Sequence, residues 1–375
     1  MPGQTTHCRA FYDAITQFSS TIRLQVVPDD FRDTSCANSN FLFVNSCNEI
    51  EIICFKTTFL KLFNEAHLYF NAFKSERNYP LNQESYLASV ALLFTSPENR
   101  SALNCHDIII SKVLETEREA YTDYWSIPSI FLQKEFLFLR ALLTCSLNRI
   151  NKSSSLWLLL RKIYVIYKER FSILNLDFQS VFQRSAEQHF SNYYCWNTVR
   201  WFYDVEGIES KLALLNQTKE FSFKHIKDVS AWSALAYMAC RTHSREEFHD
   251  SEYRRLGSHF QVEIQRNGFK NDTSLLPKRL SLIEEIKTYI ELAEVREWPP
   301  YFCLWCLMSL EGKNKVLDIF EDWYNQLLDF ERIYGRVTAI ESVGNQPQVQ
   351  DTISHTLIEV MSNKKKLLQK LNINF

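Results

Sequence analysis

The chain has 375 residues, of which 46% are hydrophobic and 14% aromatic, which is enough apolar material for a large core and excludes disorder over the whole length. It holds only 7 Gly and 9 Pro, and strand-rich folds need such turn residues often, so the composition predicts an all-α protein. The formal net charge of −2 offers no global attraction for nucleic acid, which we do not expect as a partner.

The apolar pattern also bears on the compartment. The start of the chain lacks the basic and apolar regions of a secretory signal, and no uninterrupted apolar stretch reaches about 18 residues. We therefore expect no transmembrane segment and a cytoplasmic protein whose ten cysteines stay reduced.

The first regular elements that the sequence predicts are strands. Pro28, Asp29 and Asp30 indicate a turn, and the stretches Asn40–Val44 and Glu49–Phe55 alternate β-branched and aromatic residues, which predicts a short hairpin. From Lys56 onward the apolar residues recur at helical spacing.

The rest of the chain reads as helices separated by polar breaks. The expected helices cover Gln83–Phe94, Ser101–Leu114, Ser129–Leu147, Leu156–Phe171, Asp177–His189, Cys195–Asp204, Ser230–Thr242, Arg279–Arg296, Tyr301–Leu310, Val316–Ile333 and Thr352–Leu371. Residues 243–280 are strongly polar and predict a helix plus an exposed loop, with a role that stays open. We expect an N-terminal segment at 1–55, a helical repeat domain at 56–334, a linker at 335–351 and a C-terminal helix at 352–375.

A recurrent unit runs through the helical region. Each copy has a polar loop with Asn, Ser or Asp and then a large apolar residue four positions on. The polar residue can accept hydrogen bonds from the free N–H groups of the first helical turn, and the large residue then packs on the preceding helix. The pattern predicts a solenoid of helical hairpins, an α-α superhelix, with structural anchors at Leu103, Trp157, Trp196, Trp232 and Trp305.

Several motifs that suggest chemistry have a simpler interpretation. The CxxC of Cys303 and Cys306 lacks the second ligand pair of a zinc site, so we interpret it as packing beside Trp305. His243 and His249 do not form a metalloprotease motif and indicate a surface helix. The basic run Lys364–Lys366 indicates a solvated helix face. We expect no metal, cofactor or catalytic residue in this chain.

The repeat lacks the strict period and the signature of tetratricopeptide arrays. Its clearest copy, Asn192–Trp201 (NYYCWNTVRW), instead resembles the repeat of protein prenyltransferase α subunits, in which Asn-Tyr-x-x-Trp is followed by Arg. Residues 97–110 and 228–238 are similar to two other copies, so the resemblance covers about residues 80–240. Residues 40–70 resemble the N-terminal region of the divergent third class, the α subunit of geranylgeranyltransferase type III.

The resemblance implies a non-catalytic α subunit that is active only in a heterodimer. The partner would be a β subunit, of the Rab type, that carries the catalytic zinc, and the substrate would be a prenyl-accepting protein such as a SNARE that already holds one prenyl group. Asn192, Tyr193 and Arg200 would then lie near the prenyl diphosphate. The family's Lys is replaced by Ser191, and Val199 holds the place of its usual Arg, with Arg200 one position later.

Those two departures, together with Leu103 and His106 in place of the usual anchor residues, leave a second hypothesis open. The chain would then be an α-solenoid scaffold that binds proteins and has no transferase role.

Overall fold

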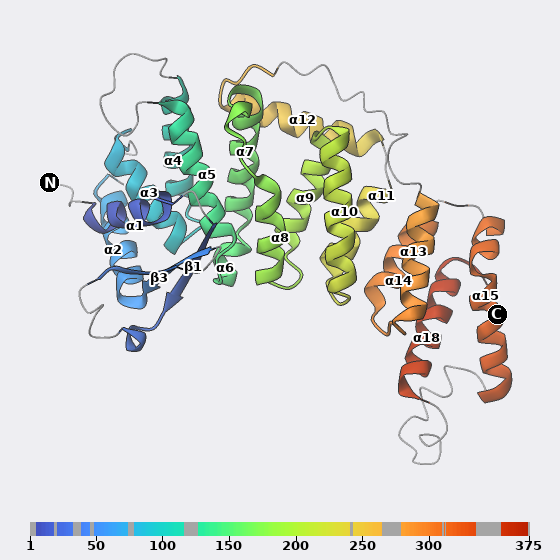
Figure 1. Cartoon of the computed structure of the whole chain (residues 1–375). Helices are drawn as coiled ribbons and strands as arrows, with labels where there is room; N and C mark the ends of the chain where they lie inside the picture. The colour runs from blue at the N-terminus through green and yellow to red at the C-terminus, as the bar shows by residue number, and fades with distance from the viewer. Residues whose placement is uncertain are drawn as a thin grey trace. The chain divides into compact units, whose positions relative to one another are not determined.

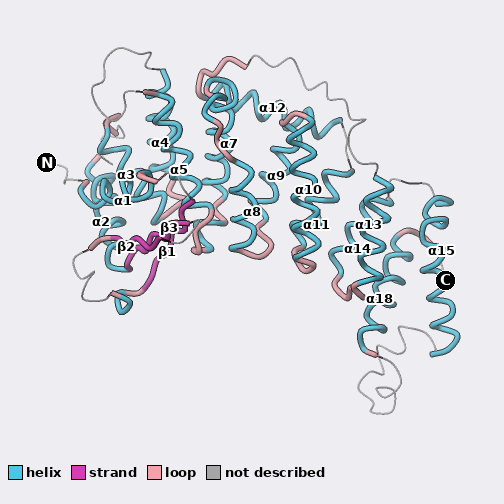
Figure 2. The backbone as a smooth tube through the Cα atoms, viewed as in Figure 1, coloured by secondary structure: helices cyan, strands magenta, loops and turns pink. Residues whose placement is uncertain are grey.

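The part of the chain that the structure describes is mostly helical. The computed structural model describes residues 5–18, 21–32, 39–45, 49–73, 79–115, 127–240, 243–264, 279–309, 311, 313–334 and 354–373. Within these residues it contains 16 α-helices and one three-stranded sheet (Figures 1 and 2). The predicted all-α class is confirmed. No described helix is long and apolar enough to cross a membrane.

The chain divides into two compact units, which we describe separately. Unit 1 comprises Met1–Thr198 and Phe248–Gly268, and unit 2 comprises Val199–Glu247 and Phe269–Phe375. The boundaries predicted from the sequence, at residues 55, 334 and 351, stay predictions, and the linker expected at 335–351 lies outside the described residues.

Unit 1 contains the sheet and the first helices. Its elements are α1 (Thr6–Thr16), β1 (Thr21–Val27), the 3-10 turn η1 (Asp29–Phe31), β2 (Phe41–Asn45), β3 (Glu49–Phe55), α2 (Lys56–Ala72), α3 (Gln83–Thr95), α4 (Arg100–Glu115), α5 (Pro128–Leu143), α6 (Asn148–Asn151), α7 (Ser154–Arg170), η3 (Ser172–Leu174), α8 (Phe178–Gln188), the start of α9 (Tyr193–Val205) and the end of α12 (His243–His259).

The sheet contains the predicted hairpin and one further strand. β2 and β3 pair antiparallel, as expected, and β1 adds to the other edge of β3 in the parallel direction. Leu24 of β1 lies opposite Ile52 of β3, and both side chains are fully buried beneath the helices. Neither β1 nor α1 was predicted from the sequence.

A buried polar network joins α3, α4 and α5. The Nε2 atom of His106 lies 2.8 Å from Oε1 of Glu135, and its Nδ1 atom lies 2.8 Å from the Ser89 hydroxyl. The Tyr86 hydroxyl donates to the second Glu135 oxygen at 2.6 Å. His106, which the sequence suggested to be a degraded anchor, is therefore a fully buried member of the core.

Unit 2 is built from helices in the residues that the structure describes. These are the end of α9, α10 (Ile208–Lys224), α11 (Val229–Ala239), the start of α12, α13 (Arg279–Leu292), α14 (Trp298–Met308), α15 (Lys313–Tyr334) and α18 (His355–Lys370). α11 packs against α10 and α14, and α18 packs against α14 and α15. The polar stretch at 243–280 forms the expected helix, α12, while its residues 265–278 lie outside the described part.

Replacing His106 by Ala tests the buried network. We expect the free energy of unfolding to fall by about 3–5 kcal/mol, because the change leaves a buried carboxylate with one partner fewer. Urea denaturation followed by circular dichroism measures it. The control is His67→Ala, on the exposed face of α2, with an expected loss of about 0.5 kcal/mol or less. Equal losses in the two variants would contradict a structural role for the network.

Candidate binding surface

The repeat helices begin on polar side chains that accept a hydrogen bond from the backbone N–H three residues on. The four caps are Asn99 (3.0 Å to Ala102 N), Ser153 (3.2 Å to Leu156 N), Asn192 (3.2 Å to Cys195 N) and Asp228 (2.9 Å to Ala231 N). In each copy the backbone oxygen of the cap also accepts from the N–H four residues on. The capping that the sequence predicts is therefore present in four copies.

The expected anchor residues differ in burial. Trp157, Trp196 and Trp232 are buried, and the indole N–H of Trp157 donates to the backbone oxygen of Asn151 at 2.7 Å. Leu103 and Trp305 are only half-buried. Three of the five predicted anchors, Trp157, Trp196 and Trp232, are thus core residues.

Asn192 is the first of the residues predicted to lie near the diphosphate. The hydrogen bonds of its side chain described below are all to residues of unit 1. Its side-chain oxygen caps α9, and its amide nitrogen donates to Oδ1 of Asn151 and, at 3.1 Å, to the hydroxyl of Ser185. All three side chains are fully buried, so the network fixes the start of α9 against α6 and α8.

Tyr193, the second predicted residue, points to solvent. It is 57% exposed, Phe190 is 58% exposed and Tyr194 is 39% exposed. The rings of Tyr193 and Tyr194 meet edge to face at 5.4 Å. We call Phe190, Tyr193 and Tyr194 the aromatic ledge. Phe190 was not predicted as a site residue from the sequence, although it lies two residues before a cap and therefore in a loop.

Arg200, the third predicted residue, belongs to unit 2. Its Nη2 atom donates to the Ser233 hydroxyl of α11 at 2.9 Å, and its guanidinium lies 5.5 Å from the centre of the Tyr237 ring. Arg200 therefore joins α9 to α11.

The two positions that depart from the suspected family pattern have structural roles. Ser191 adopts a left-handed backbone conformation, with φ of 50°, at the turn into α9. Val199 is buried. Val199 thus belongs to the core, and Ser191 holds a backbone conformation that residues other than glycine adopt rarely.

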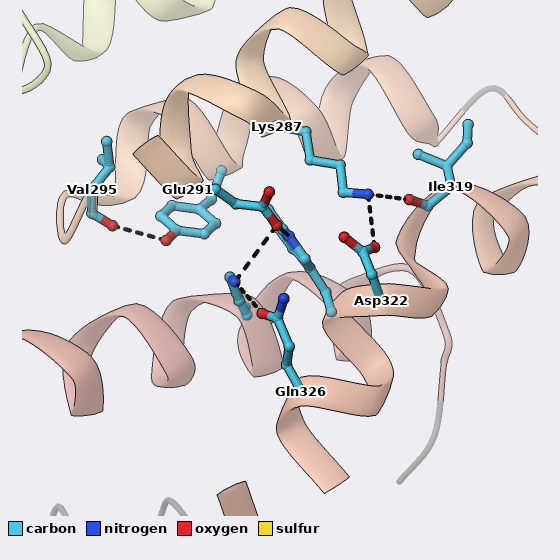
Figure 3. Close-up of polar contacts among 9 residues, drawn as sticks. Lys287, Glu291, Val295, Ile319, Asp322 and Gln326 are labelled. Carbon is cyan, nitrogen blue, oxygen red and sulfur yellow. Dashed lines mark hydrogen bonds and ion pairs between the residues drawn. The ribbon is translucent and has the colours of Figure 1, made fainter. Parts of the chain in front are cut away.

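A second polar cluster lies in unit 2 (Figure 3). Lys287 of α13 donates to Asp322 at 2.7 Å and to the backbone oxygen of Ile319 at 2.8 Å. Glu291 accepts the indole N–H of Trp323 and lies 3.9 Å from the ammonium nitrogen of Lys364. These contacts tie α13 to α15 and α18.

Lys364 is the buried centre of this cluster. Its ammonium donates to Gln326 at 2.6 Å and lies 4.7 Å from the centre of the Trp323 ring. Burial lowers the pKa of Lys364, and the carboxylates of Glu291 and Asp322 offset part of that effect. The cluster thus holds α18 by a buried cation.

The neighbouring lysines of α18 also have partners. The predicted solvated face is wrong for Lys364, which is buried, whereas Lys365 is half-buried and Lys366 is exposed. Lys365 pairs with Glu331, Lys366 lies 4.1 Å from the Trp298 ring centre, and Lys370 lies 4.9 Å from that of Trp305. The cations of Lys364–Lys366 thus meet two indole rings and a carboxylate, and Lys370 meets a third indole ring.

The residues that could have suggested a metal site, and for which we predicted none, lie on α12 and α14. His249 lies half-buried on α12, and the side chain of His243 lies outside the described residues. Within the described ranges no group of three His, Cys, Asp or Glu residues is arranged to hold a metal ion.

Replacing Lys364 by Ala tests whether the contacts of its ammonium group stabilise the packing of α18. The variant loses a charged hydrogen bond and a ring contact, and we expect the α18 amides to exchange with deuterium about ten times faster or more. The matched control is Lys366→Ala, which loses one exposed ring contact and should change the rates about five-fold or less. Equal rates in the two variants would contradict the central position of Lys364.

Comparison with known proteins identifies the family. Residues 1–144 match the model of the ECM9 N-terminal domain, residues 156–260 that of the ECM9 middle domain, and residues 280–374 that of the ECM9 C-terminal domain. The chain is also 35% identical over 377 residues to Protein ECM9 of Saccharomyces cerevisiae, a match that covers 98% of this chain and 95% of the relative.

These matches indicate no prenyltransferase family, so the resemblance inferred from the repeat is wrong. The assignment as a geranylgeranyltransferase α subunit is wrong with it, as are the zinc-bearing β subunit and the prenyl-accepting substrate as partners. The physical reason is that a polar cap followed by a buried indole is what stacked helical hairpins need whatever they do. The chain belongs to the ECM9 family.

Proposed function

We propose that this protein is a binding scaffold and that the aromatic ledge is the surface with which it holds another protein. The observation that carries the proposal is the exposure of three aromatic side chains within five residues at a firmly fixed helix start. Tyrosine and other aromatic residues are enriched where protein interfaces gain most of their energy, since they offer a large contact area with few rotatable bonds.

Hydrogen bonds fix the backbone that carries the aromatic ledge. The Asn192 network fixes the first turn of α9, and the ammonium of Lys152 donates to the backbone oxygen of Phe190 at 2.9 Å. A surface that is already ordered loses little conformational entropy on binding. The rigidity of the loop before α9 therefore favours a role in recognition.

One group of side chains resembles a catalytic triad, and its burial supports the same proposal. Ser89, His106 and Glu135 are hydrogen bonded in the order of a catalytic triad, but each is fully buried. A substrate cannot reach the Ser89 hydroxyl without opening the core between α3, α4 and α5. The arrangement thus supports a structural role for these three residues.

We place this scaffold in the cytoplasm. None of the eight described cysteines is in a disulfide, and six of them are buried. Thiols that persist in this number suit a reducing compartment.

Site-specific photo-crosslinking in cells tests the proposal. A benzophenone amino acid in place of Tyr193 is expected to give a discrete crosslinked protein, and adding Phe190→Ala and Tyr194→Ala should lower its yield about ten-fold or more. The control carries the same group at Ile173, a 90% exposed residue in η3 beyond the far end of α7, about 25 Å along that helix. Equal products from both positions, or a yield that the two alanines leave unchanged, would contradict the ledge as a binding surface.

A further inference from the structure

Three cysteines lie together where α11 packs against α14 in unit 2. Cys240 follows the last residue of α11, and Cys303 and Cys306 lie one turn apart on α14. The Sγ atom of Cys240 donates to the backbone oxygen of Cys306 at 3.4 Å, although the two residues are 66 positions apart in the chain. The fold thus brings a distant thiol onto the CxxC turn.

The two cysteines in this contact are less buried than the other described cysteines. Cys240 and Cys306 are partly exposed, whereas Cys303 and the other described cysteines, Cys8, Cys54, Cys105, Cys145 and Cys195, are buried. Within the described residues, Cys240 and Cys306 therefore combine access to solvent with a second thiol nearby.

Cys303 lies behind this pair. Burial raises the pKa of its thiol well above the usual value, and Cys306 and Cys240 add to the effect because their sulfur atoms are close. A thiol that stays protonated is a poor nucleophile. Because its side chain is also fully buried, Cys303 is shielded from a peroxide in solution.

We propose that Cys240 and Cys306 form an oxidative modification site, a dithiol that a hydroperoxide converts to a disulfide joining α11 to α14. The proposal stands independently of the binding role of the aromatic ledge.

The reaction has two steps. One thiolate attacks a peroxide oxygen, the O–O bond breaks, and a sulfenic acid and hydroxide form, the hydroxide taking up the proton that the thiol released. The second thiol then attacks the sulfenic sulfur, the S–S bond forms, and water leaves. Two thiols lose two electrons in all, and hydrogen peroxide is reduced to two molecules of water.

The bridge would close a loop of 66 residues. Because a disulfide restricts the unfolded chain more as the loop grows, we expect the oxidised protein to unfold at a temperature several degrees higher. The modification would thus stiffen the contact between α11 and α14.

Peroxide treatment of the purified full-length chain tests this. The reduced protein is exposed to hydrogen peroxide, quenched with N-ethylmaleimide and digested without reductant, and peptide mapping is expected to find a Cys240–Cys306 bridge as the main product. Mapping also separates it from products of Cys36 and Cys47, which lie outside the described residues. The matched control Cys145→Ser, which alters a buried cysteine of unit 1, should leave the yield unchanged.

The variants Cys240→Ser and Cys306→Ser should each abolish the bridge and the rise in unfolding temperature. Full alkylation of both cysteines after peroxide treatment would overturn the proposal, as would a main product that links Cys303 to Cys306. Circular dichroism of the reduced variants checks that the serine replacements leave the fold intact.

Discussion

The polar cap at the start of each repeat helix is the interaction on which the rest of this structure depends. A helix that starts inside a protein leaves backbone N–H groups that no water can reach, and each needs a partner. Asn99, Ser153, Asn192 and Asp228 supply it, and three of them are almost completely buried. Each cap side chain pairs one of these N–H groups, and in three of the four helices the large residue one turn later is buried.

The same interaction explains why the loops before these helices are well suited to recognition. Around Asn192 the cap does more than close one helix, because its amide also binds Asn151 and Ser185 from two other helices. The backbone that carries Tyr193 and Tyr194 is therefore fixed by groups beneath it. The backbone that presents the rings is thus in place before a partner binds.

Much of the fold followed from the sequence because caps and apolar periodicity are local signals. The caps, most helices and the hairpin were predicted within a few residues of their observed bounds. α10 was missed because half of its buried positions hold Lys211, Thr218 and Ser222, which hide the apolar period. β1 was missed because its pairing with β3 is a contact between distant segments.

The candidate sites were harder to predict, since they depend on which distant side chains meet. Nothing in the run Lys364–Lys366 reveals that Trp298 and Trp323 will receive its cations, and a solvated face was the natural expectation. The CxxC of α14 gave no sign of Cys240. The pattern around Asn192 correctly predicted the start of a helix, but the enzyme family inferred from it was wrong. A polar cap followed by a buried indole is needed to pack helical hairpins, so the pattern does not distinguish one family from another.

A double-mutant cycle on Asn151 and Asn192 tests most directly whether the buried caps hold the structure together. The free energies of unfolding of Asn151→Ala, Asn192→Ala and the double variant are measured by urea denaturation. If the buried amides act as one unit, the two losses should fail to add, with a coupling energy of about 1–3 kcal/mol. Losses that add to within about 0.5 kcal/mol would show that the two amides act independently, and would contradict a single buried network that fixes the start of α9.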